Sequence, residues 1–181
     1  MKNYSRKFRR MIFSVPLFLV LTFICVSQAS ASTISIDESG TINNWALNPV
    51  TSPNNDASSI SLTVQSDTQP WYVKVNDALD GNKPESSAGH LAEWNTTSSS
   101  YVTNPHVLTN NMNVAASAGS GYSVGSAISL SNTNQNIVTG SVINTPVTIP
   151  INVSQQVIYS DMHLTNDRVY RLVVTFSGGF S

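Results

Sequence analysis

The chain has 181 residues, of which 40% are hydrophobic and only 10% charged. Five of its nine basic residues lie within the first ten positions, whereas all ten acidic residues follow residue 36. From residue 32 onward, four basic residues face ten acidic ones, and the net charge is −6. This balance excludes nucleic acid and anionic membrane surfaces as expected partners, because both require a basic patch.

The first 31 residues have the three parts of a secretory signal peptide. A cationic head ends at Arg10, an apolar run extends from Met11 to Val26, and Ala29 and Ala31 occupy the −3 and −1 positions of a small-residue cleavage site. The apolar run has 16 residues, and a helix that spans a bilayer needs about 20. We therefore expect a signal peptide at 1–31, a secreted or cell-surface protein, and no stable membrane span after cleavage. An uncleaved anchor is one alternative, and a lipid anchor at Cys25 is another, which Ile24 disfavours because a lipoprotein cysteine follows a small residue.

The remaining residues, 32–181, have the length of one domain, and we expect a single one. The only cysteine is Cys25, which leaves with the signal peptide. The mature chain can therefore form no internal disulfide and no thiolate metal site.

The strand signal is an alternation of β-branched or aromatic residues with polar ones. It predicts strands at 34–37, 60–65 and 71–76, and the segment 66–70 predicts a hairpin between the last two. Ile42, Trp45 and Leu47 mark a further apolar segment between the first two strands.

The middle of the chain is less regular. Residues 76–104 are rich in Gly, Ser, Asn and Pro, and this composition predicts one long irregular segment, or excursion, between strands. Strands are predicted at 107–114, at an edge, and at 122–130. Residues 147–153 alternate again, with Pro150 requiring an edge or a bulge. The last strand, 169–176, places Tyr170, Leu172, Val174 and Phe176 on one face.

No segment after the signal peptide has a helical period of 3.6 residues. Many short strands separated by turn residues predict an all-β fold. We expect an antiparallel β-sandwich, either immunoglobulin-like or jelly-roll-like.

The sequence predicts no catalytic, cofactor-binding or metal-binding residue, and no enzyme. His90, His106 and His163 are far apart, and no Gly-x-Ser-x-Gly motif is present. One alternative is a calcium loop within Asp77–Glu85, where Asp77, Asp80, Asn82 and Glu85 offer oxygen ligands. The competing interpretation is a turn at Asp80-Gly81, and the spacing is not that of an EF-hand.

Four aromatic residues are candidates for stacking on sugar rings, although alternation requires one of the first two to face the core. They are Trp71, Tyr72, Trp94 and Tyr101. Asn95 and Asn152 lie in glycosylation sequons, which matter only in a host that has that machinery.

Two stretches resemble the WxL domain of bacterial cell-surface proteins. Asn44-Trp45-Ala46-Leu47-Asn48 carries a Trp-x-Leu, and Tyr170 to Phe176 is similar to the Tyr-led apolar strand near the end of that family. The chain departs from the family at Phe176-Ser177-Gly178, where the family repeats Trp-x-Leu. The resemblance implies an exported sandwich that attaches non-covalently to the cell wall.

These features predict a surface or envelope-associated β domain with a structural, adhesive or wall-binding role. Its expected partners are a cell-wall polymer, a glycan or other surface proteins. Two alternatives stay open: a subunit of an extracellular fibre, assembled by strand pairing through residues 32–37, and a carbohydrate-binding module.

Overall fold

The computed structural model describes residues 33–39, 42, 45–49, 54–67 and 69–181. The predicted signal peptide, 1–31, lies outside the described residues. All the described residues belong to one compact unit. In this part of the chain, no helix is long and apolar enough to cross a membrane.

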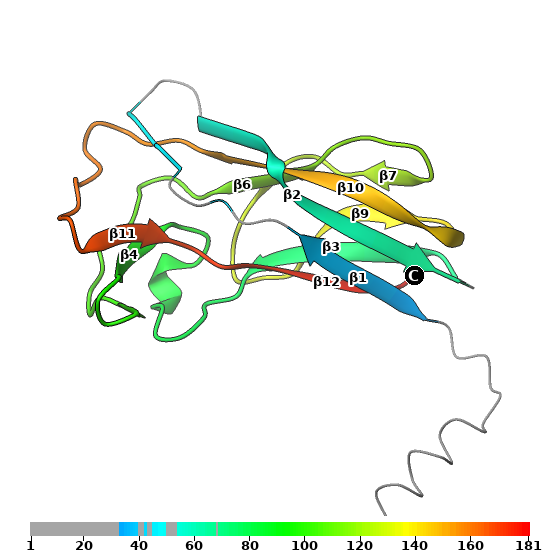
Figure 1. The fold of residues 1–181 in the computed structure, drawn as a ribbon, viewed down its shortest axis with the longest axis horizontal. Helices are drawn as coiled ribbons and strands as arrows, with labels where there is room; N and C mark the ends of the chain where they lie inside the picture. Colours follow the sequence, from blue (N-terminus) through cyan, green and yellow to red (C-terminus); the bar gives the residue numbers. More distant parts are fainter. Residues whose placement is uncertain (1–32, 40–41, 43–44, 50–53, 68) are drawn as a thin grey trace, which may run out of the picture. The chain divides into compact units, whose positions relative to one another are not determined.

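The strands form three antiparallel sheets (Figure 1). The five-stranded sheet has the order β1 (Ile34–Ser39), β2 (Asn54–Ser66), β10 (Ile143–Gln155), β6 (Asn113–Ala116) and β8 (Ile128–Ser129). The four-stranded sheet has the order β12 (Val174–Phe180), β3 (Trp71–Asp77), β9 (Gln135–Gly140) and β7 (Tyr122–Val124). The three-stranded sheet has the order β11 (Arg168–Arg171), β4 (Ala92–Asn95) and β5 (Ser100–Tyr101). A single 3-10 turn, η1 (Glu85–Ser87), is the only helical element among the described residues.

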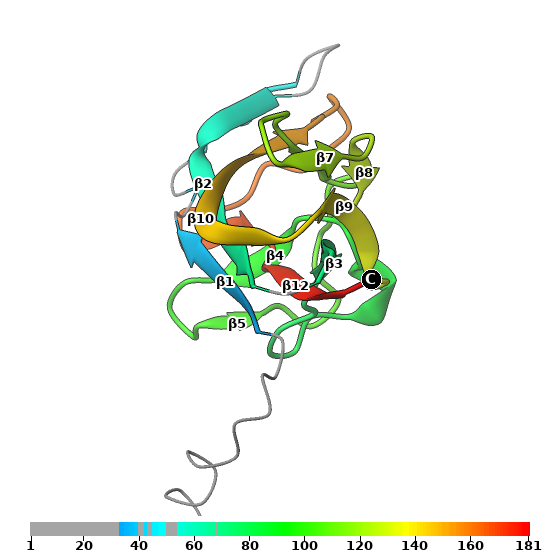
Figure 2. The ribbon, with the colours of Figure 1, turned by 90° about the vertical axis from the view of Figure 1, so that its right-hand side faces the viewer.

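The core lies between the five-stranded and four-stranded sheets, and Figure 2 shows their strands around it. Side chains of one strand alternate between two faces, and β3 is buried at every second residue. The buried side chains of β2, β3 and β10 belong to one cluster: Leu62, Val64, Trp71, Val73, Val75, Ile149, Ile151 and Val153. The predicted all-β fold and antiparallel β-sandwich are thereby confirmed.

The predicted hairpin at 66–70 is wrong. β2 and β3 lie in different sheets, so the segment between them crosses from one sheet to the other. Both edges of β2 are already paired, with β1 on one side and β10 on the other. A short polar link cannot by itself reveal this crossing, because hairpins and inter-sheet turns use the same residues.

The predicted final strand is two strands. β11 pairs with β4, and β12 pairs with β3, with a break at Leu172 and Val173. Tyr170, Leu172, Val174 and Phe176 all pack against the core cluster. The apolar pattern is continuous across the break because both strands face the same core, and the pattern therefore conceals the change of sheet.

Pro150 lies in a central strand, since β10 has β2 and β6 as neighbours. Its carbonyl accepts a hydrogen bond from Ser117 N, just beyond the end of β6 at Ala116. In an antiparallel strand the N and C=O of one residue face the same side, so the proline nitrogen faces the side where β6 has ended. A register shift between Ile151 and Val153 supplies the expected bulge, but the expected edge is wrong.

Other strands also differ from the sequence prediction. The strand predicted at 107–114 is β6, at Asn113–Ala116, and it is not an edge, because β10 and β8 flank it. The strand predicted at 122–130 is two, β7 and β8, in different sheets. Strand β9 was not predicted, because Gln135, Asn136, Thr139 and Gly140 leave only two apolar residues in it. The excursion 76–104 contains η1, β4 and β5.

The first and last strands meet at one edge of the sandwich. Ile34 and Ile36 of β1 lie against Gly178 of β12, where a Cβ would overlap the Ile36 side chain. The missing side chain therefore permits the close approach of the two edge strands. The strand predicted at 34–37 is β1, and it pairs antiparallel to β2.

Replacement of Leu62 by alanine should destabilise the sandwich by about 2–5 kcal/mol, because the side chain is fully buried and its removal leaves a cavity. Urea denaturation measures this change. Thr63→Ala, on the other face of the same strand, is the matched control and should cost less than about 1 kcal/mol. Equal losses in the two variants would contradict the assignment of the faces.

Candidate functional site

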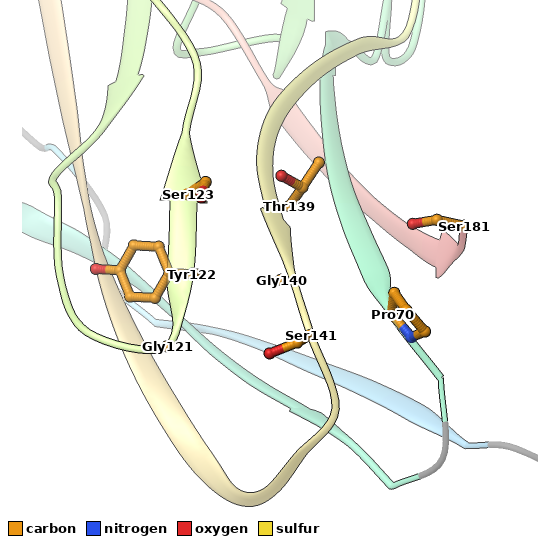
Figure 3. Close-up of a pocket in the computed structure, with 8 residues that line it drawn as sticks. All are labelled: Pro70, Gly121, Tyr122, Ser123, Thr139, Gly140, Ser141 and Ser181. Atoms are coloured by element: carbon orange, nitrogen blue, oxygen red, sulfur yellow. The ribbon is translucent and has the colours of Figure 1, made fainter.

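A shallow hollow lies at the end of the four-stranded sheet, over β7 and β9 (Figure 3). Its volume is about 380 Å³, and none of its lining side chains is charged. We call it the hydroxyl hollow, because four of its eight lining residues are Ser or Thr. The lining residues are Pro70, Gly121, Tyr122, Ser123, Thr139, Gly140, Ser141 and Ser181.

Strand register builds the hydroxyl hollow. Ser123 of β7 is directly opposite Thr139 of β9, and Tyr122 is opposite Gly140. Side chains at directly opposed positions share one face of a sheet, and Ser123 and Thr139 lie close together in Figure 3. On the other side, Ser181 N donates a 3.0 Å hydrogen bond to the carbonyl of Pro70. The hollow therefore combines exposed hydroxyls from three separate segments of the chain.

Gly140 connects the hydroxyl hollow to the core. A Cβ at this position would overlap the indole ring of Trp71, so only glycine lets β9 pass this closely over the ring. The Trp71 side chain is fully buried, and its Nε1–H has no hydrogen-bond partner among the described residues. An unsatisfied buried donor is uncommon, and this one lies next to the residue that lines the hollow.

The Tyr122 ring is fixed. Its hydroxyl donates a 2.9 Å hydrogen bond to the carbonyl of Ser117, and the ring occupies the space that a Cβ of Gly119 would need. A half-buried aromatic residue with a satisfied hydroxyl loses little freedom on binding. Ser123 and Thr139 lie on the other face of the β7–β9 pair, and they and Ser141 offer hydroxyls that can both donate and accept. This combination suits an uncharged ligand rich in hydroxyl groups.

No sequence pattern predicted this site. Thr139 lies in the unpredicted strand β9, and Ser and Thr are common throughout the chain. Only the pairing of β7 with β9 distinguishes Ser123 and Thr139 from the other hydroxyl residues.

The aromatic candidates from the sequence do not form a sugar platform. Trp71 is in the core, and the Lys74 ammonium lies 4.7 Å from the centroid of the Tyr72 ring. Trp94 and Tyr101 meet edge to face, with centroids 4.9 Å apart, and the Arg171 guanidinium lies 4.2 Å from the centroid of Trp94. The face of the Trp94 ring is therefore covered by Arg171 in a cation–π contact.

The four oxygen donors of Asp77–Glu85 all have partners within the protein. Asp77 binds Lys83, and Asp80 accepts from Arg171 at 2.8 Å and from the Tyr101 hydroxyl at 3.2 Å. Asn82 forms two hydrogen bonds with the Tyr101 backbone, and Glu85 accepts from Asn132. These oxygens fasten the loop to its neighbours and do not converge on a common point.

The histidines also stay apart, and the described residues contain no cluster of three or more His, Cys, Asp or Glu side chains suited to a metal. His90 Nδ1 is 2.8 Å from the carbonyl of Leu108, whereas His106 and His163 are exposed. Of the two sequon residues, Asn95 accepts from the backbone of Thr97 and Ser98, and Asn152 donates to Ser117.

A second cavity, of about 830 Å³, is lined largely by apolar side chains between the sandwich and the three-stranded sheet. Trp45 and Leu47, the residues of the Trp-x-Leu, line it together with Trp94 and Tyr170. Both also pack against the core cluster. In this structure the motif is therefore part of the protein's own packing.

Tyr101 should make the stability of the protein depend on alkaline pH. Burial raises the pKa of its hydroxyl, and the neighbouring Asp80 carboxylate adds to this effect. The unfolded chain releases this proton near pH 10, whereas the folded chain retains it, so stability should fall as the pH rises above about 10. Urea denaturation across pH 7–11 should show a shallower fall for Tyr101→Phe than for the wild type.

At pH 7 the same variant should lose about 0.5–1.5 kcal/mol, because it lacks the hydrogen bond to Asp80. Tyr159→Phe is the control, since that side chain is 90% exposed, and it should follow the wild-type curve. An unchanged alkaline slope in Tyr101→Phe would contradict the prediction.

Comparison of the chain with protein-family models, with curated proteins and with solved structures finds no match.

Proposed function

We propose that the chain is an exported β domain that acts at the cell surface, where it binds a neutral, hydroxyl-rich envelope polymer through the hydroxyl hollow. The observation that carries this proposal is that the side chains lining the hollow are uncharged, with Ser123, Thr139 and Ser141 among them, around a volume of about 380 Å³. Neutral polysaccharides present hydroxyl groups, which pair with such donors and acceptors without an ionic contact.

The N-terminal sequence supports export. The first strand begins at Ile34, three residues after the expected cleavage site at Ala31. The mature chain needs no oxidised cysteine, since Cys25 precedes that site. The resemblance of Asn44–Asn48 and of Tyr170–Phe176 to the WxL domain adds a link to the cell wall, and this link is part of the proposal.

Cell fractionation with N-terminal sequencing tests the location. The expected result is recovery in the envelope or the medium, with Ser32 as the first residue. A product that stays in the cytosol with residues 1–31 attached would sink the export proposal.

A pull-down on purified wall polysaccharide tests the site. Thr139→Arg fills the hydroxyl hollow with a long charged side chain, and retention of the purified domain should fall at least about tenfold, or about 1.4 kcal/mol. Asn134→Arg adds the same charge just before β9, at an exposed position outside the hollow, and should leave retention unchanged. Retention that is equal in both variants would place binding elsewhere.

Assembly by strand pairing is the second candidate, and it rests on the position of β1. This strand is the edge of the five-stranded sheet, and it starts close to the expected mature N-terminus. An edge strand offers unpaired backbone groups to a strand of another copy. Sedimentation of the purified mature domain over a hundredfold concentration range distinguishes the two: fibres or oligomers favour pairing, and a strict monomer removes it.

A further inference from the structure

A lysine and an aspartate are in contact inside the protein, with no exposure of either side chain. Asp77 is the last residue of β3, and Lys83 follows it after one turn. The Lys83 ammonium nitrogen contacts Asp77 Oδ2, and both side chains have a relative exposure of 0%. Neither residue belongs to the hydroxyl hollow.

Backbone groups hold both partners in place. Leu79 N donates to Asp77 Oδ1 at 3.1 Å, and Gly89 N donates to Oδ2 at 2.8 Å. Lys83 Nζ donates to the carbonyl of His90 at 2.8 Å. Two backbone amides therefore donate to the carboxyl group, and the lysine nitrogen contacts Oδ2 of that group while it also donates to the His90 carbonyl.

Burial disfavours the charged forms of this pair. A buried ion pair costs more in lost hydration than an exposed one, and its Coulomb attraction offsets this cost only in part. Burial lowers the pKa of Lys83, although the hydrogen bond and the charge of Asp77 act in the opposite direction. Transfer of one proton from the ammonium to the carboxylate gives an amine and a carboxylic acid, which are the reactive partners for amide formation.

We propose that Lys83 and Asp77 are joined by an intramolecular isopeptide bond. The Nζ lone pair attacks Cγ of Asp77, and the C–Oδ2 bond breaks. The two protons that the nitrogen loses leave with Oδ2 as water, so that one carboxylate and one ammonium give one amide and one water. No oxidant, reductant or further reactant is needed.

The surrounding groups suit both the reaction and its product. The Leu79 N–H stabilises the negative charge that develops on Oδ1 during attack, as a donor in an oxyanion hole does, and the Gly89 N–H holds Oδ2, the oxygen that leaves. In the product, the remaining oxygen keeps the Leu79 N–H as its donor. The single amide N–H keeps the His90 carbonyl as its acceptor. No charge then remains buried at this place.

The bond would fasten the end of β3 to the segment that leads into η1. Asp77 also connects to the five-stranded sheet, because its N–H donates to the carbonyl of Ser131, next to β8. A covalent cross-link here would join two parts of the domain, which cysteine cannot do because no cysteine follows Cys25.

Intact mass spectrometry of the purified mature domain, unfolded in acid before measurement, tests the proposal. The wild type should have a mass about 18 Da below the value calculated from its sequence, which is the loss of one water. Lys83→Arg should have the full calculated mass. Asp77→Asn should lose about 17 Da, because ammonia is then the leaving group.

A dehydrated Asp80-Gly81 step would have the same mass as the cross-link, and two measurements separate them. This alternative keeps the loss of about 18 Da in Lys83→Arg, whereas the isopeptide does not. Fragmentation of the wild-type peptide that contains the loop should give no backbone ions between Asp77 and Lys83, because one cleavage inside the ring releases no fragment.

A wild-type domain at its full calculated mass overturns the proposal, as does a complete ion series through residues 77–83. Both readings come from the wild type, so they hold even if a variant fails to fold. The result is also independent of glycan binding, since the mass can be measured whether or not the hydroxyl hollow is functional.

Discussion

The rest of the fold depends on the pairing of β2 with β10. Each strand has 13 residues, and they are the two longest strands in the described part of the chain. Their inward residues, Leu62, Val64, Ile149 and Ile151, are all fully buried and form the surface on which Trp71, Val73 and Val75 of β3 pack. β1 and β6 extend the sheet on either side of this pair. If the pair did not form, the four-stranded sheet would have no apolar face to cover.

The charged contacts consist of one pair in the interior and a few contacts nearer the surface. All four basic residues after residue 31 take part in internal contacts: Lys83 with Asp77, Arg168 with Glu93, Arg171 with Asp80, and Lys74 with the Tyr72 ring. Each of these positive charges therefore has a partner within the protein. The Arg168 and Arg171 side chains stay 26% and 33% exposed, so the positive charge that reaches the surface there lies next to a carboxylate.

The sequence predicts the class of the fold and several strand cores well, because alternation directly reports which side chains face the interior. Leu62, Val64, Trp71, Val73 and Val75 are examples. The sequence does not predict a change of sheet between two consecutive strands whose apolar residues face the same core, as at Leu172–Val173. Periodicity shows which side chains are buried, but it does not show which strand is the hydrogen-bond partner. The hydroxyl hollow could not be predicted for a related reason: Ser123 and Thr139 become neighbours only through the pairing of β7 with β9. The contact between Lys83 and Asp77 lies close in sequence, but its complete burial follows from the packing of segments as distant as Ser131.

The contact between β1 and β12 has a consequence for the order of events during synthesis. Ile34 and Ile36 come early in the chain, and Gly178, against which they pack, comes very late. The edge of the sandwich cannot close while the last strand is still inside the ribosome, and contacts between such distant segments form slowly even afterwards. A chain with this arrangement gains its complete core only after β12 has emerged.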